Sequence, residues 1–241
     1  MIHKTRGIVL HQIKYSDNSI IVTIYTELFG RQSYIIKGVH NKKSKIKSNL
    51  FQPLSLLEMD AYYKPNKNIQ NVKEIQSAHI FSSMPYDIRK SSIALFIAEI
   101  LYKTLQEQEP SKDLFNYLFH SIQLLDYKER GFSNFHLYFL IHLSKYLGFF
   151  PDNNFSGQNC YFDLQAGTFM QIKPFHPLIL EKDLSLIFSR MLSFSENQHE
   201  DINLKSNERE MLLDKLVEYY SIHHEGVKNI NSVGVLKDVL H

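Results

Sequence analysis

The apolar residues of this chain change their period once, close to Pro85, and this change constrains the fold more than any other feature. Before Pro85 they come in short runs rich in β-branched and aromatic residues, such as residues 20–26, separated by turn residues. After it they recur at helical spacing, as in Ile93, Ile97 and Ile100. The first pattern is typical of strands and the second of amphipathic helices. The sequence therefore predicts an α+β chain with its strands first.

Five strands are predicted near the N-terminus, at residues 7–15, 20–26, 32–39, 54–59 and 71–75. The turn before the third strand contains Gly30, which can adopt a positive φ. The fifth strand is the least regular, because Ile69, Val72 and Ile75 have helical spacing. Five strands in so short a segment favour a small closed barrel, since closure removes exposed strand edges. We expect an OB-fold barrel over residues 1–80.

A helical domain is predicted for the rest of the chain, residues 81–241. Its helices are expected at about 93–104, 111–125, 133–147, 177–193 and 207–220, with a last one from 231 or 232. Ser111 is the expected N-cap of the second helix, and Asn207 with Glu210 the expected capping box of the fifth. A small hairpin insertion is expected at about 158–173, around the turn at Ala166 and Gly167.

Charge is unevenly distributed along the chain. Residues 1–80 hold 12 Lys and Arg against 5 Asp and Glu, whereas residues 81–241 hold 15 against 20. The strongest local signal is residues 37–47, which contain five lysines and no acid. Like charges repel one another, so such a segment gains by meeting a polyanion. A basic loop that is merely solvated remains the alternative.

Aromatic residues also occur along the predicted barrel, at Tyr15, Tyr25, Tyr34 and Phe51. OB-type barrels bind single strands by stacking bases on aromatic rings beside a cationic groove. A barrel of this size also fills its interior with side chains, so some of these rings must be core. Strand alternation places Tyr34 and Ile36 on one face, and Ile35 and Lys37 on the other.

Marker residues for common enzyme classes are missing from the sequence. It contains no GxxxxGK[ST], GxGxxG, GxSxG or HExxH motif, and Cys160 is its one cysteine. We therefore expect no catalytic residues, no cofactor, no metal and no disulfide. The chain starts without the long apolar run of a signal peptide, and its most apolar stretch, residues 93–102, is too short to span a bilayer. A soluble cytoplasmic protein without membrane association is expected.

Seven pieces of the N-terminal segment form a specific ensemble: RGIVL at 6–10, YSD at 15–17, IYTE at 24–27, GR at 30–31, KG at 37–38, KKSK at 42–45 and LFQPL at 50–54. In this order and spacing they resemble the RecO family, the bacterial recombination mediators. The helical half agrees in layout, with a proline-led helix after the barrel and Phe-Phe-Pro at 149–151.

The resemblance implies an OB-fold followed by a helical domain in a non-enzymatic DNA repair protein, associated with the nucleoid. Members bind single- and double-stranded DNA, anneal complementary strands, and engage the C-terminal tail of single-stranded-DNA-binding protein. With the partner RecR they help to load recombinase onto coated strands. The DNA-contact residues that it implies are Arg31, Lys37, Lys42, Lys43, Lys45 and Lys47. Arg6 matches as well, and a structural role for it stays open.

One feature departs from the family pattern. Many relatives hold a four-cysteine zinc site between the helices, whereas this chain offers Cys160 alone there. We expect no zinc, and a hairpin held instead by Tyr161, Phe162, Phe169 and Met170. A protein-interaction adaptor whose helical half is the functional surface, and a hydrolase with dispersed site residues, remain the rival function classes.

Overall fold

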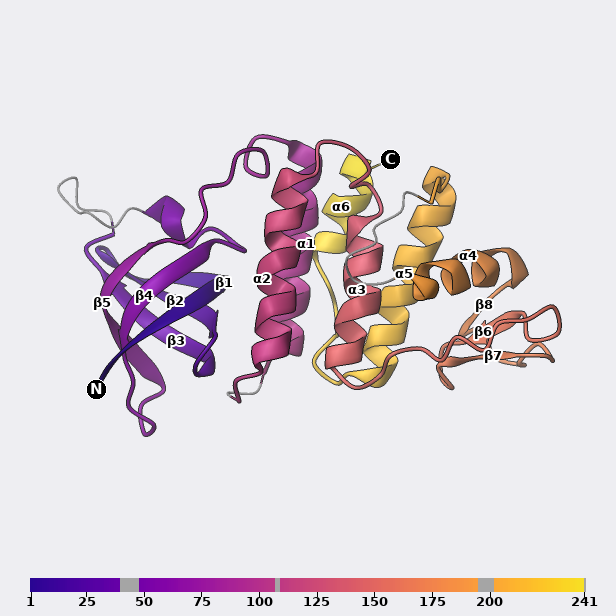
Figure 1. Ribbon diagram of the computed structural model, residues 1–241, viewed down its shortest axis with the longest axis horizontal. Helices are drawn as coiled ribbons and strands as arrows, with labels where there is room; N and C mark the ends of the chain where they lie inside the picture. Colours follow the sequence, from indigo (N-terminus) through magenta and orange to yellow (C-terminus); the bar gives the residue numbers. More distant parts are fainter. Residues whose placement is uncertain (40–47, 107–108, 195–201, 241) are drawn as a thin grey trace. The chain divides into compact units, whose positions relative to one another are not determined.

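The computed structural model describes residues 1–39, 48–106, 109–194 and 202–240. They form two compact units, Met1–Tyr127 and Lys128–His241, which Figure 1 colours from indigo to magenta and from red to yellow. The first unit contains all the barrel strands together with α1 and α2. This compact unit therefore extends past residue 80, where the sequence predicts a domain boundary.

The predicted barrel is confirmed, and its strands are β1 (Ile2–Ser16), β2 (Ser19–Thr26), β3 (Gly30–Lys37), β4 (Leu56–Tyr62) and β5 (Ile69–Ser77). They close in the order β1-β2-β3-β5-β4, with β3 and β5 parallel and the other pairs antiparallel. A short 3-10 helix, Ser48–Phe51, precedes β4. Val72 and Ile75 pack against the barrel core, which explains why a segment with helical spacing forms a strand.

Alternate residues of each strand fill the barrel. Ile20, Val22 and Ile24 of β2 face inward, as do Tyr34 and Ile36 of β3, and all of them are buried. This alternation is the period-two pattern of a strand with one face in a core. The turn before β3 is closed by Gly30, whose φ is 59°, as the sequence predicts.

Helices α1 (Ile88–Thr104) and α2 (Lys112–Tyr127) complete the first unit and lie side by side in Figure 1. The predicted apolar stripe of α1, including Ile93 and Ile97, is buried. The Leu114 amide donates to Ser111 Oγ at 3.3 Å, so the predicted N-cap of α2 is confirmed. Asp87 caps α1 by accepting from the Arg89 amide at 2.9 Å.

The second unit combines helices with a small sheet. Its helices are α3 (Phe135–Tyr146), α4 (Lys182–Ser193), α5 (Ser206–His223) and α6 (Ser232–Leu240). Its strands are β6 (Tyr161–Asp163), β7 (Thr168–Met170) and β8 (Ile179–Leu180), in the order β7-β6-β8. The predicted hairpin is therefore present, and β8 extends it to a three-stranded sheet.

Two predicted helix starts in this unit are wrong. Helix α4 begins at Lys182 rather than Pro177, because Ile179 and Leu180 pair with β6 instead. Helix α5 begins at Ser206, and the Lys205 amide donates to the Glu208 carboxylate at 2.9 Å. The capping box is therefore formed by Lys205 and Glu208, two residues before the expected pair of Asn207 and Glu210. The Glu208 carboxylate already satisfies the free backbone amide at the start of the helix.

Two of the four residues that were expected to hold the hairpin form the packed side of the small sheet. Phe162 and Phe169 are buried and stack edge-on at 4.9 Å, and Phe162 also meets Phe188 of α4 at 4.8 Å. Tyr161 and Met170 pair with each other on the opposite face, and Met170 is 39% exposed. Phe162 and Phe169 therefore form the packed side of the hairpin, and Tyr161 and Met170 form a cross-strand pair on its outer side.

None of the helices in the described part of the chain has both the length and the apolar character that a membrane crossing requires.

Candidate nucleic-acid interface

Lys37 ends β3 on the outer surface of the barrel. It lies opposite Ser19 in the ladder and is exposed, because Ile36 takes the inward position before it. Gly38 follows with a φ of 79°, and its amide donates to the Asn18 carbonyl oxygen at 2.6 Å. This bond fixes the end of β3 against the β1–β2 turn. Four further predicted DNA contacts lie outside the described residues: Lys42, Lys43, Lys45 and Lys47.

Arg31 is directed at the end of α1. Its Nη1 donates to the carbonyl oxygens of Tyr102 at 2.6 Å and Leu105 at 2.9 Å. The guanidinium also lies 4.5 Å from the centre of the Tyr102 ring. Burial lowers the pKa of Arg31 from its usual value. These contacts satisfy the free carbonyls of a helix C-terminus and join the barrel to α1.

Arg6 makes the matching link to α2. Its Nε and Nη2 donate to the two carboxylate oxygens of Glu27, each at 2.9 Å. The guanidinium lies over the rings of Phe115 and Phe119, at 5.2 and 4.8 Å. The hydrogen bond with Arg6 lowers the pKa of Glu27 and raises that of Arg6. A structural role of Arg6, which the sequence leaves open, accounts for all of these contacts.

The barrel aromatics divide between core and surface. Tyr34 and Phe51 are fully buried in the barrel, and Tyr25 is buried with its ring stacked on Phe115 at 6.3 Å. Burial raises the pKa of the Tyr34 hydroxyl well above its usual range. Tyr15 is 62% exposed near the end of β1. Three of the four rings are therefore packed inside the unit, and Tyr15 is the one available to a ligand.

Acidic residues gather on the face of the barrel formed by β1, β4 and β5. Four of the five acids in residues 1–80 line one groove of about 840 Å³, together with three basic residues: Glu27, Glu58, Asp60 and Glu74, with Lys4, Arg6 and Lys73. In the ladder Glu58 lies opposite Arg6, and Asp60 lies opposite Lys4. The excess positive charge of residues 1–80 consequently belongs to other parts of this segment.

The β4–β5 loop carries two lysines that the sequence analysis missed. Lys64 and Lys67 are exposed, and they line a hollow of about 230 Å³ with Tyr62, Gln70 and Asn71. The buried Gln70 amide shapes the loop, accepting from the Lys64 amide and donating to the Lys64 and Lys67 carbonyl oxygens at 2.8 to 3.1 Å. The turn residues Pro65 and Asn66 between two apolar runs were the signal available in the sequence.

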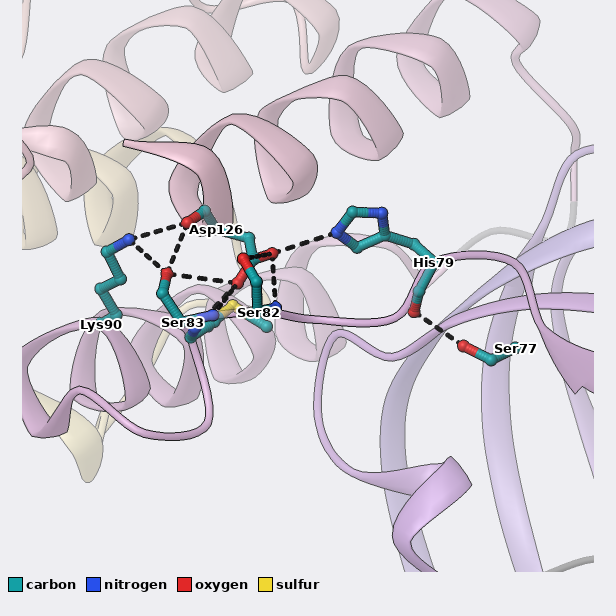
Figure 2. Close-up of polar contacts among 7 residues, drawn as sticks. Ser77, His79, Ser82, Ser83, Lys90 and Asp126 are labelled. Carbon is teal, nitrogen blue, oxygen red and sulfur yellow. Dashed lines mark hydrogen bonds and ion pairs between the residues drawn. The ribbon is translucent and has the colours of Figure 1, made fainter. Parts of the chain in front are cut away.

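A buried carboxylate fixes the segment between the barrel and α1 (Figure 2). Asp126 of α2 accepts from the amides of Ser82, Ser83 and Met84 at 2.8 to 2.9 Å and contacts His79 Nε2 at 3.2 Å. Burial by itself would raise the pKa of Asp126, but these donors outweigh it and hold the pKa far below its usual range. The cluster forms a rigid connection rather than an open site.

Lys90 completes this cluster from α1. Its Nζ donates to Ser83 Oγ at 2.5 Å and to the Asp126 carbonyl oxygen at 2.8 Å, and the side chain is nearly inaccessible. Figure 2 shows Lys90 and His79 on opposite sides of Asp126. The positive charge of Lys90 is thus used within the fold.

The free thiol of Cys160 lies directly before β6 of the second unit and is half-buried. Across the ranges that the structure describes, no three His, Cys, Asp or Glu side chains gather closely enough to hold a metal ion. Asp163 instead accepts from the Gln165 and Ala166 amides at 2.8 and 3.2 Å, which closes the β6–β7 turn.

A closed five-stranded barrel of OB type, followed by a helical region with a small separate sheet, is the class of protein that these features define. Comparison with known families agrees with it. The family model "Recombination protein O N terminal" matches residues 1–81, and "Recombination protein O C terminal" matches residues 85–229.

Curated relatives are similar over almost the whole chain. The protein of Phocaeicola vulgatus is 38% identical over 239 residues, and that of Bacteroides fragilis is 41% identical over 243 residues. The protein of Azobacteroides pseudotrichonymphae is 37% identical over 239 residues. Each alignment covers 99% of both chains, and each relative is named DNA repair protein RecO. This chain belongs to the RecO family of DNA repair proteins.

Proposed function

We propose that this protein is a non-enzymatic recombination mediator. In this proposal it binds DNA through its barrel, anneals complementary strands, and helps to load recombinase onto strands coated by single-stranded-DNA-binding protein. Membership of the RecO family supports the proposal.

The observation that carries the DNA-binding step is the segregation of charge in the N-terminal 80 residues. They hold 12 basic residues against 5 acids, and four of those acids line a single groove. Outside that groove, residues 1–80 hold nine basic residues against one acid, Asp17, which leaves an excess of positive charge for phosphates. Contacts of lysine with phosphate hold a strand without reading its sequence, as a mediator acting on any broken DNA requires.

The proposed phosphate contacts are the five lysines of residues 37–47, namely Lys37, Lys42, Lys43, Lys45 and Lys47. Arg31, the sixth predicted contact, is given a structural role here because its Nη1 is used at the end of α1. Lysines that neutralise phosphates also lower the repulsion between two DNA backbones, which favours annealing.

The proposed partners are single- and double-stranded DNA, RecR, and the C-terminal tail of single-stranded-DNA-binding protein. The proposed location is the cytoplasm at the nucleoid, and no cofactor is required. Binding, annealing and handover of a strand break no covalent bond, so the proposed function uses no catalytic residue.

The test is fluorescence anisotropy of a labelled single-stranded oligonucleotide, titrated with protein at several salt concentrations. With five phosphates neutralised, we expect log K to fall with log salt at a slope of about −3.5. Reversal of four of these lysines (K42E, K43E, K45E and K47E) should abolish binding at moderate salt. The charge-matched control reverses four exposed lysines elsewhere (K112E, K182E, K205E and K228E) and should retain it.

A slope near zero, or equal losses in the two reversed proteins, would overturn the lysine assignment. If the wild type binds no DNA at low salt, the adaptor hypothesis takes its place and the functional surface moves to the helical half.

A further inference from the structure

The parallel pair of strands that closes the barrel is short. Strand β5 pairs with β3 through Ile69, Gln70 and Asn71 alone, and its remaining residues, 72–77, pair only with β4. Within the ranges that the structure describes, no further backbone hydrogen bond joins residues 72–77 to a loop or turn. One edge of β5 is therefore without a neighbouring strand beyond Asn71, and we call residues 72–77 the open edge.

One backbone hydrogen bond shows which groups of β5 point away from β4. The Ala78 amide donates to the Leu56 carbonyl oxygen at 2.8 Å, directly after the last ladder pair of β4 and β5. Hydrogen-bonded and non-hydrogen-bonded pairs alternate along an antiparallel ladder. Residues an even number of positions before Ala78 therefore direct their amides and carbonyls at β4, whereas Ile75 and Ser77 direct theirs away from it.

The side chains of the open edge are accessible. Lys73, Glu74, Gln76 and Ser77 are exposed, and Ile75 is half-buried where it packs against the barrel core. Figure 1 shows β5 on the side of the barrel away from α1 and α2. An accessible strand edge is a template for another extended chain. In such pairing the main-chain hydrogen bonds supply affinity, and alternate side chains supply specificity.

Two features limit which chains can pair with the open edge. Lys73 is the extra residue of a β-bulge, because the ladder with β4 steps from Glu74 directly to Val72. Charged side chains and bulges are common means by which proteins prevent indiscriminate pairing at an edge strand. A partner segment must therefore be short enough to avoid the bulge and must carry a charge that suits Glu74.

The charges beside the open edge favour a basic partner. Glu74 lies opposite Asp60 in the ladder, and both carboxylates line the groove of about 840 Å³ on this face of the barrel. Arg6, which lines the same groove, is already bound by Glu27 through two hydrogen bonds of 2.9 Å. Like charges directly opposite each other destabilise a ladder, and a cation beside them relieves the repulsion.

The alternation of β5 defines the side chains that suit an added strand. Glu74 and Gln76 point to the outer face of the barrel, and Ile75 between them points toward its core. Side chains of an added strand lie beside those of β5 on the same two faces. Basic residues then lie beside Glu74, and apolar residues lie beside Ile75.

We propose that the open edge of β5 binds an extended segment of a partner protein in which basic and apolar residues alternate. The backbone groups of Ile75 and Ser77 pair with the segment, and Glu74 contacts its basic side chains. The inference goes beyond the proposed function, because carboxylates and backbone groups at this edge recognise a peptide, whereas the proposed DNA contacts are the lysines of residues 37–47.

The first experiment measures hydrogen exchange of backbone amides in the full chain by nuclear magnetic resonance. In the free protein the amides of Ile75 and Ser77 should exchange faster than those of Glu74 and Gln76, which donate to β4. The probe is a short peptide of alternating lysine and valine. At a peptide concentration of about ten times its Kd, exchange at Ile75 and Ser77 should slow about tenfold, with Glu74 and Gln76 unchanged.

The second experiment measures the affinity of the labelled peptide by fluorescence anisotropy. Glu74→Lys should weaken binding about tenfold, because it replaces an attractive charge with a repulsive one. The new lysine lies opposite Asp60, so the variant should keep a stable ladder, which circular dichroism verifies. The control Glu225→Lys makes the same charge change at an exposed residue of the second unit and should bind as the wild type does.

Two methylated peptides test the backbone pairing itself. Amides that point to one edge of a strand alternate with amides that point to the other, so methylation of every valine nitrogen blocks one edge of the peptide and methylation of every lysine nitrogen blocks the other. When the valines lie beside Ile75, one edge of the peptide faces β5. One methylated peptide should therefore lose binding and the other should retain it.

Unchanged exchange at Ile75 and Ser77 when the peptide is added, equal losses in Glu74→Lys and Glu225→Lys, or equal affinities of the two methylated peptides would overturn the proposal. Protection of Ile75 and Ser77 that rises with protein concentration in the absence of peptide would replace it with pairing between two copies of the chain. DNA binding is measured separately on the lysines of residues 37–47, so its outcome is independent of these results.

Discussion

The Arg31 guanidinium lies 4.5 Å from the centre of the Tyr102 ring while its Nη1 donates to the Tyr102 carbonyl oxygen at 2.6 Å. One arginine on a barrel strand thus holds both the ring and the backbone of a residue in the last turn of α1. Arg6, whose guanidinium lies over the rings of Phe115 and Phe119, makes the matching contact with α2. Two basic residues of the N-terminal segment thus attach the barrel to its helices.

Replacement of Arg31 should therefore affect stability more than DNA binding. Arg31→Ala loses two charge-assisted hydrogen bonds and the ring contact, which should lower the free energy of unfolding by about 2 kcal/mol in a urea titration. Arg31→Lys should recover part of this loss, because lysine keeps the charge but not the planar guanidinium. The exposed Arg130 provides the control variant, Arg130→Ala. A salt slope reduced by Arg31→Ala with unchanged stability would contradict this role.

Asp126 should be the most sensitive polar position of the first unit. In Asp126→Asn the NH₂ replaces one carboxylate oxygen, so it faces either the Ser82 amide or the amides of Ser83 and Met84, and the cluster loses its charged acceptor. We expect a loss of about 3 kcal/mol in the free energy of unfolding. A variant as stable as the wild type at pH 7 would show that the carboxylate is dispensable.

The contribution of Asp126 should also depend on pH, with a definite sign. Its pKa is lower in the folded than in the unfolded chain, so folding favours the ionised form. The stabilisation is complete above the unfolded pKa of about 3.9 and is lost as the pH falls through the lowered folded value. The stability difference between wild type and Asp126→Asn should therefore narrow as urea titrations are repeated from pH 6 down to pH 3, starting below about pH 5. A difference that widens on acidification would refute the assignment.

Gln70 should control the order of the β4–β5 loop. Gln70→Ala removes the three hydrogen bonds that connect this buried amide to Lys64 and Lys67. The loop should then open more often, and limited trypsin digestion should cleave faster after Lys67, while Pro65 protects the bond after Lys64. Gln76→Ala, which removes an exposed bond to Glu58, is the control and should be cleaved at the wild-type rate.

Gly7 should tolerate no side chain. A Cβ at this position would lie 2.6 Å from Ile24 Cγ2 and 3.3 Å from Met59 Sδ inside the barrel. Gly7→Ala should lower the free energy of unfolding by about 1 to 3 kcal/mol, because the core must shift to admit the methyl group. Gly157→Ala, where nothing lies within 4 Å of the new Cβ, should change it by less than about 0.5 kcal/mol. Equal changes in the free energy of unfolding for the two variants would show that the barrel core accommodates the added methyl group without loss of stability.

The sequence by itself determined the features that depend on neighbouring residues. Alternation in residues 20–26 and 34–36 established which side chains fill the barrel, because successive side chains of a strand face opposite ways. Helical spacing established the buried stripe of α1, and the hydroxyl of Ser111 established the start of α2. Each of these signals operates over a few residues of chain.

The tertiary structure alone decided the features that join distant residues. The contacts of Arg31 with Tyr102 span 71 residues, so the sequence could suggest a DNA contact but could not reveal a helix end. The sequence did not predict strand β8, because its partner Phe162 lies in a separate segment of the chain. Pro177 suggested a helix start, but the residues that follow it pair with β6 instead. Strand register places residues of distant segments side by side, as where Ile21 lies opposite Ile13 of β1 and Ile35 of β3. Which residues of two neighbouring strands face each other depends on how the barrel closes, and the barrel closes only when all its strands are in place.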